Sequence, residues 1–364
     1  MEPRLAPKRI LNILVTGNPG GIERLCLDVA RFSEEDNHFY FLWGGGVIAD
    51  SICNYTKNVV IRHFSYRRII QEYISLRNYI DRNAIEIILV QAPSPAVLMY
   101  LDLLRLSRRN IRICTYIHSD PIDIFTSDIK RLQFKLFTKH IDGCIAVSEY
   151  VAMETRRMFK IDNIKVIYNG TDIEKFGKSE NSLQNDCVRL IYVGRLIKEK
   201  GIDLLIRVLA NIDTKYTLTI VGDGPCRIEL EKLSKLLGLA DKIAFLGTRN
   251  DVNDLLQDAD LFVHPAVWKE GFGITLIESM AAGVPCLAFA RGAVPEIISD
   301  DINGFLVNEF TEEAFEKRLS EVMRLLAETP DRFSEIVAAA RDRAKDFNIY
   351  MYVQTLSHFL HSLL

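Results

Sequence analysis

Strand-like apolar segments alternate with helix-like segments along nearly the whole chain, and this alternation constrains the fold more than any other feature. Parallel strands joined by helices require right-handed crossovers, and repeated crossovers build a doubly wound α/β sheet. In such sheets ligands bind beyond the carboxyl ends of the strands. The strand-like segments are residues 10–15, 38–43, 58–63, 85–90, 111–117, 141–147, 188–193, 218–221, 243–246 and 260–264. The helix-like segments are residues 25–32, 67–82, a stretch from Ser94, 127–139, 202–212, 226–237, 251–257 and one that closes at Gly283.

The pattern restarts at Val188 after a polar stretch, which predicts two domains. A chain of 364 residues is long enough for two cores of ordinary size. The polar stretch predicts a linker over residues 174–187.

Composition indicates a globular protein of the cytoplasm. Hydrophobic residues make up 48% of the chain and charged residues 26%. No apolar run approaches the ~18 residues of a membrane-spanning helix, and the basic start runs into a strand rather than a signal peptide. Seven cysteines without a C-x-x-C pair indicate reduced thiols.

The two halves of the chain differ in charge. Residues 1–172 hold 23 Lys and Arg against 19 Asp and Glu, whereas residues 173–364 hold 22 against 29. Two basic amphipathic segments, Arg67–Arg82 and Lys130–Lys139, lie in the first half. Such patterning is commonest on a solvent-exposed helix. The more specific alternative is that these segments contact an anionic membrane surface.

A glycine-broken loop within residues 263–278 carries the strongest chemical signal. Glu270 lies in this loop, and Glu278 lies roughly 6 Å along the next helix if that helix begins near Ile274. Gly271 and Gly273 leave backbone N–H groups open near the positive end of the helix. The loop therefore offers an anion cradle flanked by two hydroxyl-binding carboxylates, which suits a nucleotide-sugar.

Other strand ends carry weaker signals. Gly20 and Gly21 lie in a turn that either binds an anion or simply joins a strand to a helix. The sequence of the turn, G-N-P-G-G, departs from the G-x-G-x-x-G fingerprint of NAD-binding proteins. His118 ends a strand, although a lone histidine is more often structural. Arg195 and Lys200 follow a strand and belong to the residue types that grip phosphate, yet either one alone is more often a surface charge.

Together these residues carry a family resemblance. The chain resembles the retaining glycosyltransferases of family four, which have the two-domain GT-B fold, along nearly its whole length. The most specific matches are Gly194-Arg195, Lys200-Gly201, Gly222-Asp223-Gly224-Pro225 and the E-x7-E pair Glu270/Glu278. Weaker matches are Gly20-Gly21-Ile22-Glu23, His118, Ser148 and Asn169-Gly170.

The resemblance implies two Rossmann-like domains facing a central cleft. Residues 1–173 would bind the acceptor and residues 188–345 the nucleotide-sugar. Residues 346–364 would form a C-terminal helix that packs back on the first domain.

It also implies roles for the site residues. Glu278 would accept hydrogen bonds from the ribose and Glu270 from the hexose, while Arg195 and Lys200 would stabilise the departing diphosphate. No metal or other cofactor is expected, because the cations would replace it. The implied catalytic residues are Glu270, Arg195, Lys200 and His118. The implied donor-binding residues are Gly20, Gly21, Gly194, Gly222, Gly224, Arg249, Gly271, Phe272, Gly273, Ile274 and Glu278.

The resemblance further implies a substrate class. A UDP-hexose or UDP-N-acetylhexosamine would donate, with retention, to a lipid-linked or growing surface glycan, as in polysaccharide or lipopolysaccharide biosynthesis. Expected partners are this donor and the glycan acceptor, with no nucleic acid. The basic segments of the first half, rather than the resemblance, add contact with the anionic inner face of the plasma membrane as an expectation. A non-catalytic GT-B subunit and a GT-B nucleotide-sugar epimerase stay open as alternatives, whereas the missing fingerprint disfavours a dehydrogenase.

Overall fold

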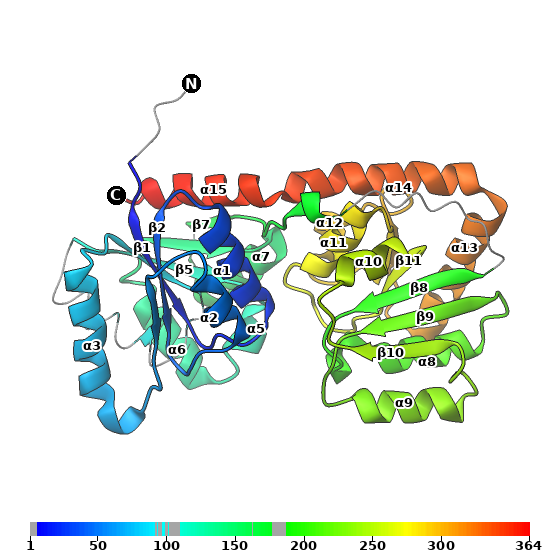
Figure 1. The fold of residues 1–364 in the computed structure, drawn as a ribbon, viewed down its shortest axis with the longest axis horizontal. Coiled ribbons are helices and arrows are strands. Elements are labelled where there is room, and N and C mark those ends of the chain that lie inside the picture. The colour runs from blue at the N-terminus through cyan, green and yellow to red at the C-terminus, as the bar shows by residue number, and fades with distance from the viewer. Residues whose placement is uncertain are drawn as a thin grey trace. The chain divides into compact units, whose positions relative to one another are not determined.

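The chain forms two compact units, each with its own parallel sheet. The computed structural model describes residues 6–91, 93, 97–98, 101, 110–161, 163–176 and 187–364. The first unit comprises Met1–Gly170 together with Ile349–Leu364, and the second comprises Thr171–Asn348 (Figure 1). The C-terminal segment is therefore part of the first unit, although it follows the second in sequence.

The first unit is built on a seven-stranded sheet in the order β3-β2-β1-β4-β5-β6-β7. Its strands are β1 (Arg9–Leu14), β2 (Asp36–Phe41), β3 (Val59–Ile61), β4 (Ile87–Val90), β5 (Arg112–Ile117), β6 (Gly143–Ala146) and β7 (Ile164–Val166). All these pairs are parallel. The strand order reverses between β1 and β4, so the segments that follow these strands lie at a topological switch point.

Helices cover the first sheet. They are α1 (Gly21–Phe32), α2 (Val47–Ile52), η1 (Tyr66–Arg68), α3 (Ile69–Arg82), α5 (Pro121–Ile124), α6 (Asp128–Phe137), α7 (Glu149–Phe159) and α15 (Ile349–His361). Every residue of β4 is buried, as expected for a parallel strand covered on both faces. Phe32 of α1 meets Tyr350 of α15 edge to face, with ring centroids 5.1 Å apart. Such contacts attach α15 to the first unit.

The second unit has a six-stranded parallel sheet in the order β10-β9-β8-β11-β12-β13. Its strands are β8 (Val188–Val193), β9 (Tyr216–Val221), β10 (Ile243–Gly247), β11 (Leu261–His264), β12 (Cys286–Phe289) and β13 (Phe305–Val307). Its helices are η2 (Ile173–Lys175), η3 (Lys198–Lys200), α8 (Ile202–Ala210), α9 (Arg227–Leu236), α10 (Val252–Gln257), α11 (Ile274–Ala282), α12 (Val294–Ile297), α13 (Glu312–Glu328), α14 (Pro330–Ala344) and η4 (Lys345–Phe347). Here the strand order reverses between β8 and β11.

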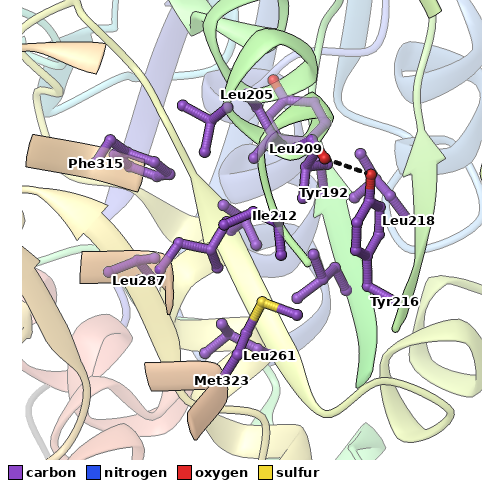
Figure 2. Packing of buried hydrophobic residues seen from close by; sticks show 14 of the residues in the cluster. Tyr192, Leu205, Leu209, Ile212, Tyr216, Leu218, Leu261, Leu287, Phe315 and Met323 are labelled. Carbon is purple, nitrogen blue, oxygen red and sulfur yellow. Dashed lines mark hydrogen bonds between the residues drawn. The ribbon is translucent and has the colours of Figure 1, made fainter. Parts of the chain in front are cut away.

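The core of the second unit joins its sheet to α8 and α13 (Figure 2). Leu205 of α8, Leu261 and Leu287 of the sheet and Phe315 of α13 are all fully buried. The Tyr216 hydroxyl, which is also buried, donates to the Leu209 carbonyl at 2.7 Å. Its polar end is thereby satisfied inside an apolar core.

The doubly wound α/β fold predicted from the alternation is confirmed. The helix predicted over residues 25–32 begins earlier, at Gly21, and the strand predicted over residues 58–63 is shorter. Three strands, β7, β12 and β13, were not predicted, because their three or four residues carry too little pattern to identify. The helix predicted from Ser94 begins at a residue outside the described ones. Most of the predicted linker, namely residues 177–186, also lies outside them.

No helix within the described part of the chain combines the length and the apolar character needed to cross a membrane.

Candidate active site

Lys200 and Glu270 form an ion pair in the second unit. Lys200 ends η3, which follows β8, and Glu270 lies between β11 and α11. The Lys200 Nζ donates to Glu270 Oε2 at 2.6 Å, and both side chains are largely buried. β8 and β11 are neighbours in the sheet, so the pair lies where a doubly wound sheet binds its ligands.

Two glycines let the segments that carry this pair approach each other. Gly201 has a φ of +67°, and a Cβ there would lie 2.1 Å from the Pro265 carbonyl oxygen. Gly292 has a φ of +61°, and a Cβ there would lie 2.2 Å from the Glu270 carbonyl oxygen. Both obstacles are backbone atoms, so a side chain at either position would displace the loop that holds Glu270.

The charge state of the pair follows from its surroundings. Burial favours the protonated form of Glu270, but the Lys200 ammonium and the neighbouring His264 together outweigh burial and hold the pKa of that carboxyl well below its usual range. Burial lowers the pKa of His264, whose Nε2 lies 3.4 Å from Glu270 Oε2. At neutral pH the site therefore presents a carboxylate that can accept from hydroxyls, beside an ammonium that can bind phosphate.

Of the predicted donor-binding glycines after β8 and β9, two lie against backbone atoms and one against a buried tyrosine side chain. A Cβ at Gly222 would lie 2.0 Å from the Gly194 carbonyl oxygen, and one at Gly224 would lie 2.4 Å from the Leu196 carbonyl oxygen. A Cβ at Gly194 would lie 2.6 Å from the Tyr192 hydroxyl oxygen. Packing alone therefore requires these glycines, and their contact with a donor stays a prediction.

Arg195 lies on the loop that these glycines shape. Its backbone carbonyl accepts from the Tyr192 hydroxyl at 3.2 Å, which anchors the residue at the end of β8. Its side chain is exposed, and no ion pair joins it to another described residue. The guanidinium is therefore available to an anionic ligand.

Five of the predicted donor-binding residues lie in α11 or in the loop directly before it. Gly273 has a φ of +100° and directly precedes the helix, whose first N–H groups lack partners within the helix. Glu278 is half-buried and lies one turn beyond Ile274, on the same face. Gly271 and Phe272 are buried, and the Phe272 ring packs on Phe347 with ring centroids 5.7 Å apart. The Phe272 side chain thus supports the loop, which leaves its backbone as the part that can face a ligand.

Arg249, also predicted to bind the donor, follows β10 and is exposed. Its guanidinium is paired with Asp251, and the Nε donates to Asp251 Oδ1 at 2.8 Å. A donor phosphate would have to compete with this carboxylate.

The predicted turn after β1 has its own carboxylate. Gly20 precedes α1, and a Cβ at Gly20 would lie 2.3 Å from a Glu23 carboxylate oxygen. A Cβ at Gly21 would have no neighbour within 4 Å among the described residues. Glu23 therefore approaches the helix N-terminus, where it competes with an anionic ligand.

His118 directly follows β5 and lines a cavity of about 260 Å³ inside the first unit. Its Nε2 lies 2.8 Å from Gln91 Oε1, and burial lowers the pKa of His118 to about 3. The imidazole is therefore neutral near pH 7. Apolar cavity-lining residues include Val15, Ile22, Leu98 and Phe125.

Sequence reasoning missed three residues that support these sites: Gln91, His264 and Gly292. Gln91 and His264 lie at the carboxyl ends of β4 and β11, and Gly292 lies in the loop after β12. The strand-end rule that identified His118 would have identified the first two. No local sequence pattern predicts the contact of Gly292 with Glu270.

Comparisons with known proteins identify the family. A model described as Glycosyltransferase Family 4 matches residues 19–175, and a model described as Glycosyl transferases group 1 matches residues 174–339. An uncharacterized glycosyltransferase of Methanocaldococcus jannaschii is 33% identical over 52% of this chain and 55% of its own. N-acetyl-alpha-D-glucosaminyl L-malate synthase of Bacillus anthracis is 30% identical over 62% of each chain. The matched region thus spans 55% to 62% of the length of these relatives.

A solved structure agrees in fold. HepE of Anabaena, crystallised in complex with UDP, is similar with a TM-score of 0.82 and 20% identity, over 98% of this chain and 100% of that chain. Because the two models follow each other along residues 19–339 and the fold agrees over nearly the whole chain, this protein belongs to the group 1 glycosyltransferases of family four, with the GT-B fold.

Proposed function

We propose that this protein transfers a hexose or N-acetylhexosamine from a UDP-sugar to a hydroxyl group of a lipid-linked or growing surface glycan, with retention of anomeric configuration. The observation that carries the proposal is the Lys200–Glu270 ion pair. Glu270 lies in the loop before α11, where the helix N-terminus also favours an anion. One small region thus offers a phosphate-binding cation and a hydroxyl-binding carboxylate.

Each donor group has a matching partner in this proposal. Lys200 and Arg195 bind the diphosphate and stabilise the charge it gains on leaving, with help from the N–H groups of Gly273 and Ile274. Glu270 accepts from hexose hydroxyls, and Glu278 accepts from the ribose hydroxyls. The leaving phosphate takes the proton of the attacking hydroxyl, so the mechanism requires no separate base.

Relatives guide the choice of donors. HepE was crystallised with UDP and also with UDP-glucose, and the Bacillus anthracis relative is named for an N-acetylglucosaminyl product. UDP-glucose and UDP-N-acetylglucosamine are therefore the first donors to test.

The cavity beside His118 supports an acceptor with an apolar part. Most of its named lining is aliphatic or aromatic, and the neutral His118 adds hydrogen-bonding capacity without charge. Lys130 also lines the cavity and offers a cation to an acceptor that carries phosphate. This combination suits a lipid-linked glycan better than a free sugar, which needs many polar partners.

Membrane contact through α6 would bring such an acceptor within reach. Ile129, Leu132 and Leu136 are exposed by 71%, 58% and 49%, and they follow one another on one face of α6. Lys135 and Lys139 are exposed nearby, whereas Phe134 and Phe137 are buried in the first unit. The exposed face thus combines apolar and basic side chains, as membrane-surface helices do.

Calorimetry with UDP and the two UDP-sugars tests the donor site. Lys200→Met and Glu278→Gln should each weaken UDP-sugar binding by about tenfold or more. Lys235→Met, which changes an exposed lysine on α9, is the matched control and should bind normally. Unchanged affinity in both site variants contradicts the donor assignment.

Turnover distinguishes the alternatives. A transferase consumes the UDP-sugar faster when a membrane extract supplies acceptors, and the sugar appears in the lipid fraction. Conversion of UDP-N-acetylglucosamine to an epimer without acceptor identifies an epimerase. Binding with no turnover under either condition identifies a non-catalytic subunit.

A further inference from the structure

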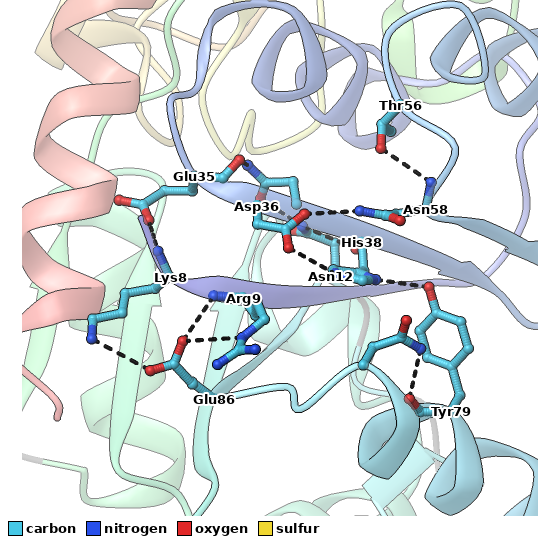
Figure 3. Close-up of polar contacts among 12 residues, drawn as sticks. Lys8, Arg9, Asn12, Glu35, Asp36, His38, Thr56, Asn58, Tyr79 and Glu86 are labelled. Atoms are coloured by element: carbon cyan, nitrogen blue, oxygen red, sulfur yellow. Dashed lines mark hydrogen bonds and ion pairs between the residues drawn. The ribbon is translucent and has the colours of Figure 1, made fainter. Parts of the chain in front are cut away.

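A chain of buried amide side chains crosses the first sheet and ends at His118. The His118 Nε2 lies 2.8 Å from Gln91 Oε1, and Gln91 Nε2 donates to Asn12 Oδ1 at 3.0 Å. Asn12 Nδ2 donates in turn to Asn37 Oδ1 at 3.1 Å and to the His38 carbonyl at 3.4 Å. The chain thus runs from the end of β5 through β4 and β1 to the start of β2, whose polar residues appear in Figure 3.

The direction of these hydrogen bonds is set at the β2 end. The backbone carbonyls of Glu35 and His38 can only accept, so they require the NH₂ groups of Asn37 and Asn12 to face them. Asn12 then has its carbonyl oxygen left for Gln91, which must offer its NH₂ group.

The same logic fixes the proton on His118. With its NH₂ group used by Asn12, Gln91 has only Oε1 left for the imidazole, and this oxygen requires a donor. His118 must therefore carry its proton on Nε2. A neutral imidazole carries one ring proton, so Nδ1 keeps a lone pair.

We propose that Asn12 and Gln91 are positioning residues, which hold His118 as its Nε2–H tautomer so that Nδ1 accepts a hydrogen bond from a hydroxyl of the substrate. The tautomer follows from this network alone, whereas the substrate contact rests on the proposed function. Asn12 and Gln91 are each 1% exposed, so water does not compete with the chain of bonds. Tyr116 also lines the cavity, but its hydroxyl already donates to the Ile167 carbonyl. His118 Nδ1 has no hydrogen bond to another described residue and is thus the available acceptor on this ring.

Nuclear magnetic resonance of protein labelled with ¹⁵N in its histidine rings tests the tautomer. The chain has seven histidines, and the signals lost in His118→Gln assign this one. At pH 7 the wild-type protein should show one His118 tautomer, with the proton on Nε2. Gln91→Leu should populate both tautomers, because the imidazole loses its partner.

Thr115→Val is the matched control. Thr115 is buried on β5 near His118, and its hydroxyl has no partner among the described residues. This variant should keep the wild-type tautomer. A wild-type signal for the Nδ1–H form overturns the proposal without any variant, and so does a single unchanged tautomer in Gln91→Leu.

Substrates with one hydroxyl replaced by fluorine test the contact. Fluorine cannot donate a hydrogen bond, so one such donor or acceptor should lose about tenfold in kcat/KM with the wild-type enzyme. The same replacement should cost nothing further in His118→Ala, because the accepting nitrogen is gone. Equal losses in both enzymes overturn the contact. A fixed tautomer in a protein without transferase activity would instead refute the proposed function and leave the positioning role intact.

Discussion

At the scale of single residues, the Lys200–Glu270 pair links charge to stability. The Glu270 pKa is depressed in the folded protein, so its contribution to stability is complete above the unfolded pKa of about 4.3. That contribution is lost as the pH falls through the lower, folded pKa. Glu270→Gln should therefore lower the free energy of unfolding by about 1–3 kcal/mol at pH 7, because it leaves Lys200 without its counter-ion.

Fluorescence can measure this effect in the second unit alone. The chain has two tryptophans, Trp43 in the first unit and Trp268 in the second, so Trp43→Phe leaves a reporter for the second unit. In that background, the stability difference between wild type and Glu270→Gln should stay constant from pH 7 to pH 5 and shrink below about pH 4. A difference that grows on acidification would contradict the depressed pKa.

The glycines give a second prediction at this scale. Gly201→Ala should destabilise the second unit and weaken UDP binding, because its Cβ would meet the Pro265 carbonyl oxygen. Gly238→Ala is the matched control, since Gly238 has a similar φ of +71° but no neighbour within 4 Å of the added Cβ among the described residues. The control should cost only the backbone strain, about 1–2 kcal/mol, and leave UDP binding unchanged. Equal effects of the two substitutions on binding would mean that the loop contact is unimportant.

At the scale of elements, α6 presents two apolar faces, and only one is buried. We expect vesicles containing phosphatidylglycerol to bind the protein at low salt through the exposed face. Lys130, Arg131, Lys135 and Lys139 changed together to Gln should reduce binding, since each basic residue near an anionic surface contributes about 1 kcal/mol. Leu132→Gln with Leu136→Gln should reduce binding further by removing apolar contact.

Cosedimentation with vesicles checks this expectation. Ile228→Gln with Leu236→Gln on α9 is the control, because these side chains are also exposed, by 65% and 82%, but lie in the second unit. The control should bind as well as wild type. A role for α6 at the membrane is refuted if vesicle binding is unchanged by salt and by every α6 substitution. It is also refuted if the protein does not bind vesicles at low salt.

At the scale of the whole molecule, α15 belongs to the first unit although it follows the second in sequence. His361 Nε2 of α15 lies 2.8 Å from Glu35 Oε1, and Leu360 is 1% exposed. Leu360→Ala should destabilise the first unit by about 2–4 kcal/mol, as measured through Trp43 in a Trp268→Phe background. Leu326→Ala on α13 should have its main effect on the second unit, measured through Trp268. The reverse pattern would assign α15 to the second unit.

The sequence by itself determined the doubly wound sheets, because hydrophobic alternation and the glycines after the strands are local features. It also indicated Glu270 and Lys200 as site residues, since charged groups at the carboxyl ends of strands are visible along the chain. Tertiary structure decided how these residues meet. Lys200 and Glu270 are 70 residues apart, and Gln91 and Asn12 are 79 apart, so no local pattern could pair them.

Tertiary packing also gave different environments to residues that the sequence had grouped together. Phe272 is buried against Phe347, whereas Arg195 is exposed, although both were predicted to serve the donor site. The return of residues 349–364 to the first unit is likewise invisible in their helical pattern, which shows an apolar face but not its partner. Local sequence therefore determined which helices and strands form and which strand ends carry candidate site residues. The contacts between distant segments, which depend on close approach of backbones and buried hydrogen bonds, were decided only in the folded molecule.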